Sequence, residues 1–169
     1  MPTHYLTRAL PWIAGALALA SPAAQAAAPA ASAPAPAAAP AGILRLQSTN
    51  SFDETVARLK ADVAAKGIRL FDQIDQAALG AQANLPVQRS TLIIFGNPPL
   101  GIQFLQSSPY AGLDWPVRML VFEDAEHRVW VSWTSFDTIA ARYGITDRTA
   151  QIQMAGSVAA SIAAAAAGK

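Results

Sequence analysis

The sequence predicts one α+β domain behind an N-terminal leader and linker. From residue 43 onward, short strand-like segments alternate with amphipathic helix-like segments. Two strand-like segments, residues 117–124 and 128–135, are separated only by Ala125-Glu126-His127, which is typical of an antiparallel hairpin. The composition, 53% apolar and 14% charged, is that of a mostly globular chain of 169 residues.

Residues 1–26 have the features of a secretory signal peptide. Arg8 lies in a short polar start, residues 9–20 are mostly apolar, and Ala24-Gln25-Ala26 places small residues at a cleavage site. An apolar run of about 12 residues is shorter than the roughly 20 that span a bilayer. We therefore expect cleavage after Ala26, no transmembrane helix in the mature chain, and a periplasmic or secreted protein.

Residues 27–42 consist almost entirely of Ala and Pro, which predicts a disordered linker. The chain has no Cys, so disulfides, thiolate nucleophiles and Cys-ligated metals are excluded. Its net charge is +1, and loss of Arg8 with the leader would leave equal numbers of basic and acidic residues. Because a neutral domain does not attract phosphate backbones, we expect no nucleic acid partner.

The first two elements of the domain are a strand and a capped helix. Residues 43–47 alternate between apolar and polar side chains, as in a half-buried strand. Ser51 then begins a capping box, in which its hydroxyl accepts from the Glu54 amide and the Glu54 side chain reaches back to the cap. The helix is expected to run to about Lys66 and to stop at Gly67.

The middle of the domain predicts two more strands and two short helices. Residues 68–75 form a strand, and residues 76–83 a short helix that Asp75 caps. Residues 91–96 are almost continuously apolar, which indicates a strand inside the sheet. A Gly-Asn-Pro-Pro corner, one or two helical turns and a loop then lead to the hairpin, whose Trp130 and Trp133 point to opposite faces.

Two helices complete the chain. One begins at Ser135-Phe136-Asp137 and ends at Gly144, and the second is an Ala-rich helix over residues 148–169. This divides the folded part into a core domain, residues 43–147, and a terminal helix. The terminal apolar run, residues 154–168, is short and weakly hydrophobic for a membrane span, so we expect it to pack on the domain or in a homodimer.

Several segments together resemble one known family. GIRLFDQID, LIIFGNPPLGIQFLQ and PYAGLDWPVRMLVFED, in this order, are similar to the domain of unknown function 302 family, DUF302, over Leu46–Ile145. The resemblance implies an antiparallel-rich sheet with helices packed on one face, in a TATA-binding-protein-like topology, with no implication of DNA binding. The family has no settled activity. This chain has Gln76 and Trp115 where members often have His and Leu, which puts in doubt any role built on that His.

Few residues could perform catalysis. His127 is the one histidine outside the leader, and a turn tip rarely buries a histidine as a catalytic triad requires. No phosphate-binding glycine loop is present, and neither a metal nor a cofactor is expected. A carboxylate-dependent hydrolase or isomerase using Asp75 or Asp114 is the enzymatic alternative.

The candidate ligand site consists of Gly96, Asn97, Tyr110, Asp114, Trp115 and Asp75. Gly96 would allow a ligand close to the strand end, Asn97 and Asp114 would anchor it, and Trp115 or Tyr110 would form an apolar wall. The other interpretation is a strand corner where Asn97 satisfies nearby backbone groups. We expect a non-enzymatic exported domain that binds a small ligand or a partner protein; a module that dimerises through the terminal helix or a sheet edge is a further alternative.

Overall fold

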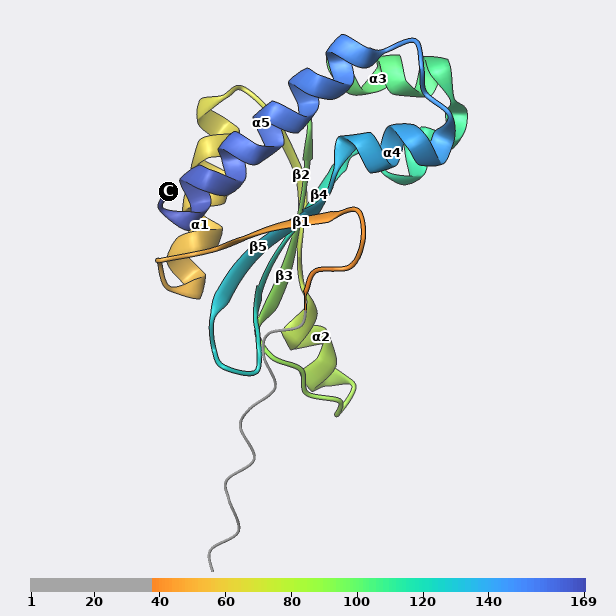
Figure 1. Ribbon diagram of the computed structural model, residues 1–169. Coiled ribbons are helices and arrows are strands. Elements are labelled where there is room, and N and C mark those ends of the chain that lie inside the picture. Colours follow the sequence, from red (N-terminus) through yellow and green to blue (C-terminus); the bar gives the residue numbers. More distant parts are fainter. Residues whose placement is uncertain (1–37) are drawn as a thin grey trace, which may run out of the picture. The chain divides into compact units, whose positions relative to one another are not determined.

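A five-stranded antiparallel sheet with the strand order β1-β5-β4-β3-β2 organises the molecule (Figure 1). The computed structural model describes residues 38–169, so the predicted leader and most of the linker lie outside the described residues. The elements are β1 Ile43–Gln47, α1 Phe52–Ala65, β2 Arg69–Asp75, α2 Gln76–Gln82, β3 Ser90–Gly96, α3 Pro98–Ser107, the 3-10 helix η1 Pro109–Leu113, β4 Val117–Glu123, β5 Val129–Thr134, α4 Phe136–Tyr143 and α5 Thr149–Ala167.

The core lies between one face of the sheet and the helices α1 and α5, which pack side by side (Figure 1). On β3 the residues Thr91, Ile93 and Phe95 are buried on this face, while the residues between them are half-buried on the other face. This alternation follows from the period of two of a strand. The α+β fold with an antiparallel sheet and helices on one face is confirmed.

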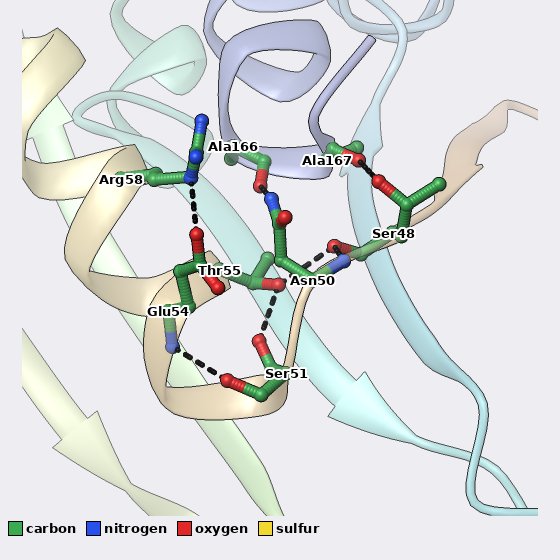
Figure 2. A network of polar contacts seen from close by, with 9 residues as sticks. Ser48, Asn50, Ser51, Glu54, Thr55, Arg58, Ala166 and Ala167 are labelled. Atoms are coloured by element: carbon green, nitrogen blue, oxygen red, sulfur yellow. Dashed lines mark hydrogen bonds and ion pairs between the residues drawn. The ribbon is translucent and has the colours of Figure 1, made fainter.

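The β1–α1 corner confirms half of the predicted capping box. The Ser51 hydroxyl accepts a hydrogen bond from the Glu54 amide at 3.3 Å (Figure 2). The Glu54 carboxylate does not reach back to the cap but pairs with Arg58 one turn later, at 2.9 Å. That part of the prediction is wrong, because an i,i+4 ion pair competes for the same carboxylate.

The same corner holds the end of α5. The Asn50 side chain donates to the Ala166 carbonyl at 3.1 Å (Figure 2). The Thr49 amide donates to the Ala167 carbonyl at 3.0 Å. The last carbonyls of a helix have no partner within it, so these bonds satisfy groups that otherwise need water. The β1–α1 corner therefore fixes the C-terminal end of α5 on the domain.

Helix α5 is part of the core. Its inner face buries seven residues: Ile152, Ala155, Ala159, Ile162, Ala163, Ala166 and Ala167. Within the described part of the chain, α5 is the one helix whose 19 residues are long and apolar enough to cross a membrane. Burial of a whole face against α1 and the sheet is what a core helix of a globular domain also shows.

The hairpin places its two tryptophans as predicted. Trp133 is buried under the helices, whereas Trp130 is half-buried on the other face. The Trp130 indole donates to Asp124 at 2.8 Å, and Asp124 also accepts from the Arg128 side chain at 2.7 Å. Burial alone raises the pKa of Asp124, but these hydrogen bonds and the charge of Arg128 outweigh it and lower the pKa to about 2.

Candidate binding site

Five of the six predicted site residues lie at one end of the sheet, where β3 ends and β4 begins. Figure 1 shows α3 and α4 at this end and α2 at the other. We call this end the rim and define it by the residues Gly96, Asn97, Tyr110, Asp114 and Trp115. Antiparallel pairing brings them together, because the end of β3 lies beside the start of β4.

Asp75, the sixth candidate, lies at the opposite end of the sheet. Strand β2 begins at Arg69, which pairs with Gly96, and ends at Asp75, which pairs with Thr91. The Asp75 carboxylate accepts from the Ala78 amide at 2.9 Å and so caps α2, as the sequence indicated. It takes no part in the rim.

Trp115 fills the space between the two segments that flank it. A Cβ atom on Gly101 of α3 would lie 1.7 Å from the Trp115 indole nitrogen, and one on Gly96 would lie 3.3 Å from it. The ring also meets Phe71 edge to face, with their centroids 6.1 Å apart. The two glycines therefore accommodate a tryptophan of the chain itself, where the sequence analysis expected them to admit a ligand.

Asn97 and Tyr110 are on the surface of the rim. Asn97 is the N-cap of α3, but its side chain makes no capping hydrogen bond. Its backbone carbonyl instead accepts from the amides of Leu100 and Gly101, at 3.1 and 2.9 Å. The Tyr110 side chain is 71% exposed on η1. Both polar groups are accessible to a partner.

Asp114 is buried and is the acceptor for three other side chains. Arg142 donates to its Oδ2 atom at 2.7 Å, and the Tyr143 hydroxyl donates to the same oxygen at 2.6 Å. Arg118 donates to Oδ1 and also to the Leu113 carbonyl, the latter at 2.9 Å. The carboxylate thus joins the end of η1, the start of β4 and the last turn of α4.

These contacts decide the charge of the cluster. Burial by itself raises the pKa of Asp114, but hydrogen bonds from Tyr143, Arg142 and Arg118, together with the charge of Arg142, outweigh it and lower the pKa. The pKa of Tyr143 is raised, first by its bond to the Asp114 carboxylate and then by burial. At neutral pH the carboxylate is ionised and unsuited to donate a proton as a general acid.

A small hollow opens beside Asp114. It is lined by Asp114, Val117, Arg118, Thr134, Phe136 and Ile139. It has room for about one water molecule. The hollow is therefore too small to enclose a metabolite but large enough for a single oxygen atom.

Sequence reasoning missed Gly101, Arg118, Arg142 and Tyr143. A glycine inside a helix often marks a close approach of another group, so Gly101 carried a usable signal. Arg142 and Tyr143 carried none, because they are 28 and 29 residues from Asp114 and belong to another helix. Among the described residues, no group of three or more His, Asp or Glu side chains could hold a metal ion.

A comparison with solved structures shows that this fold occurs in another protein. The chain superposes on the crystal structure of an uncharacterized conserved DUF302 protein from Bacillus stearothermophilus with a TM-score of 0.69. The match covers 75% of this chain and 99% of that chain at 11% sequence identity. The likeness at this identity shows the fold.

The family follows from the sequence match. The model of the family "Domain of unknown function DUF302" matches residues 44–166, a span that includes α5. The chain belongs to the DUF302 family.

The curated relatives are longer proteins. Fluoride-specific ion channel FluC 1 of Brucella suis and FluC 2 of Brucella melitensis are each 32% identical to this chain over 105 residues. The match covers 62% of this chain. The chain spans about two fifths of the length of these relatives, 41% and 39%.

Proposed function

We propose that this chain is an exported, non-enzymatic domain that binds a partner protein through the rim. The carrying observation is that Tyr110 of the rim is exposed, that Phe71 beside Trp115 is also exposed, and that the partly exposed Arg118 and Arg142 hold Asp114 of the rim. Trp, Tyr and Arg are the residues that most often dominate the energy of protein interfaces.

A partner protein fits this surface better than a small ligand does. Small-molecule sites usually enclose most of the ligand in a cavity of about 300 to 1,000 Å³. The hollow beside Asp114 has room for about one water molecule, and the Trp115 ring occupies the space between Gly96 and Gly101. Exposed aromatic side chains beside a hollow of this size suit a protein segment.

No observation favours the enzymatic alternative. The Asp75 carboxylate is exposed and caps α2, and the Asp114 carboxylate is held by two arginines and a tyrosine. A role as general acid needs a carboxyl with a raised pKa, and the pKa of Asp114 is lowered.

The relatives support a role as a module within larger assemblies. In the Brucella proteins named fluoride-specific ion channels, the matched segment is only about two fifths of the protein. We infer that the domain in this chain acts beside another protein, to which its predicted linker would give it freedom to orient.

Site-specific photo-crosslinking in living bacteria tests the proposed surface. A photoreactive phenylalanine analogue at position 110 of the rim should form one discrete adduct, to be identified by mass spectrometry. The analogue at Leu79, which is 53% exposed on α2 at the other end of the sheet, is the matched control. Loss of the adduct in a folded Phe71→Ala variant, which removes the ring that packs on Trp115 of the rim, supports the rim, and an adduct formed only from position 79 contradicts it.

Export has a separate test. The mature protein should be recovered from the periplasm or medium with an N-terminus that begins at Ala27, as read by Edman sequencing. A full-length chain that starts at Met1 and stays in the cytoplasm would contradict export and leave the rim proposal standing.

A further inference from the structure

We propose that Arg118 and Arg142 together bind a carboxylate of the partner protein. The inference rests on the proposed function, since it names the chemical group that the rim recognises. It depends on three observations: the two guanidinium groups converge on Asp114, both retain free donors, and the hollow lined by Asp114 and Arg118 has room for about one oxygen atom.

Asp114 holds the two guanidinium groups side by side. Arg118 binds the Oδ1 atom and Arg142 binds the Oδ2 atom of the same carboxylate. Because the Asp114 side chain is only 5% exposed, the inner sides of both arginines are directed toward the protein. Their outer parts are in contact with solvent, with 48% of the Arg118 side chain and 50% of the Arg142 side chain exposed.

The cluster has spare positive charge and spare donors. Two guanidinium groups face one carboxylate, which leaves one positive charge uncompensated. A guanidinium carries five N–H donors. Within residues 38–169, the hydrogen bonds of Arg118 come from its Nη2 atom alone, and that of Arg142 comes from its Nη1 atom alone. A second carboxylate could bridge the outer donors as Asp114 bridges the inner ones, in charge-assisted hydrogen bonds.

The hollow favours a carboxylate carried on a larger chain. Besides Asp114 and Arg118, its lining residues include Thr134 and the apolar residues Phe136 and Ile139. One oxygen of an Asp or Glu side chain could replace the water that fits there, while its methylene groups contact the apolar wall. A phosphate carries up to two negative charges at neutral pH where a carboxylate carries one, so its Coulomb repulsion from Asp114 is the larger.

Side-chain NMR of the mature chain tests this site. Arginine Nε–Hε signals are followed during titration with tetraglutamate, with inorganic phosphate and with sodium chloride at matched ionic strength. Saturable shifts of the Arg118 and Arg142 signals by tetraglutamate are expected, with binding about tenfold weaker in Arg142→Gln. Arg58→Gln is the matched control, because Arg58 is equally exposed and pairs with Glu54 on α1.

Each outcome decides the proposal. Non-saturable shifts, saturation by phosphate alone, or equal loss of binding in Arg58→Gln would overturn it. If Arg142→Gln does not give a folded spectrum, Arg118→Gln replaces it at the other oxygen of Asp114. Should tetraglutamate fail to bind the wild-type chain while the crosslinks at position 110 form in wild type and persist in Arg142→Gln, the carboxylate site is wrong and the proposed function stands.

Discussion

At the scale of single residues, Gly101 and Trp115 occupy complementary space. A glycine inside a helix costs about 1 kcal/mol relative to alanine, so a helical glycine needs a reason. Here a Cβ atom at position 101 would lie 1.7 Å from the Trp115 indole nitrogen. The approach of the indole ring to the α3 backbone supplies that reason.

The first prediction concerns this pair. Gly101→Ala should destabilise the domain by about 2 kcal/mol through overpacking, in spite of the better helix propensity of alanine. In a Trp115→Ala background the same change should be neutral or stabilising by up to about 1 kcal/mol. Urea unfolding of the four variants gives the coupling energy.

A matched control for this cycle is Gly112→Ala. A Cβ atom at Gly112 would meet only Leu105, at 3.7 Å, which is ordinary van der Waals contact. If Gly101→Ala costs the same with and without the tryptophan ring, the two residues do not compete for space.

The second prediction concerns the Asp114 carboxylate. Asp114→Asn should cost about 2 kcal/mol at pH 7, because bonds to charged donors lose their charge assistance in a buried place. The folded-state pKa of Asp114 is lowered from 3.8, so its contribution is complete above that value and is lost as the pH falls through the lowered pKa.

Urea unfolding at pH 7 and pH 3 measures this effect. The stability difference between wild type and Asp114→Asn should shrink at the lower pH. A difference that grows on acidification would mean that the carboxyl has a raised pKa, which would reopen the enzymatic alternative. Tyr143→Phe, which removes one hydroxyl donor to Asp114, should cost about 1 kcal/mol at pH 7.

At the scale of elements, helix ends are fixed by the corners that meet them. The side-chain amide of Asn50 donates to the carbonyl of Ala166 in the last turn of α5, whereas the Asn97 side chain at the start of α3 makes no capping hydrogen bond. The carbonyl end of a helix carries partial negative charge and the amide end partial positive charge. The same Asn→Asp change should therefore act in opposite directions at the two places.

The third prediction follows from this asymmetry. Asn50→Ala should cost about 1 kcal/mol, and Asn50→Asp more, because a carboxylate cannot donate and lies at the negative end of α5. Asn97→Asp should be neutral or slightly stabilising, since a carboxylate is favourable at an N-cap. Thermal melting followed by circular dichroism compares them. Equal destabilisation by both Asp variants would contradict the role assigned to the α5 terminus.

Local patterns predicted these elements well. The strand at residues 43–47, the Ser51 hydroxyl at the start of α1 and the Asp75 cap of α2 all depend on neighbours within four residues. The burial expected of Leu44 in that strand was wrong, because Leu44 is 47% exposed on an edge strand. The partner of the Glu54 side chain was wrongly predicted, because the cap at Ser51 and the Arg58 side chain are both within its reach and it binds Arg58. Local spacing alone does not rank such competitors.

At the scale of the whole molecule, α5 completes the core. Its inner face packs on α1 and the sheet, and the family match extends to residue 166. Its seven buried residues belong to the hydrophobic core, so removal of the helix would expose apolar surface of α1 and the sheet to water.

The fourth prediction is that the domain does not fold without this helix. A chain that ends at Asp147 should show no cooperative thermal transition by circular dichroism. Within the full chain, Ile162→Ala should cost about 3 kcal/mol because Ile162 is fully buried. Met154→Ala on the exposed face of α5 is the matched control and should change stability by less than about 0.5 kcal/mol. A cooperative transition in the shortened chain would show that α5 is only an accessory.

The exposed sheet edges bear on self-association. The edge strand β2 has a register shift between Leu70 and Asp72, and it carries the exposed carboxylates of Asp72 and Asp75. Irregular, charged edges oppose strand pairing with a second copy. Dimerisation through β2 is therefore disfavoured, and light scattering of the mature chain measures its oligomeric state directly.

The sequence by itself determined which segments along the chain form strands and helices and which residues begin α1, α2 and α4, because these depend on periodicity and on near neighbours. It also carried the family, through segments that occur in a fixed order. Only the tertiary structure decided that Trp115 fills the space between Gly96 and Gly101, and that Arg142 and Tyr143 reach Asp114 from another helix. It also decided that Asp75 lies at the far end of the sheet. Contacts of this kind depend on which segments, distant in the sequence, the order of strands in the sheet brings together. No local sequence pattern specifies that order.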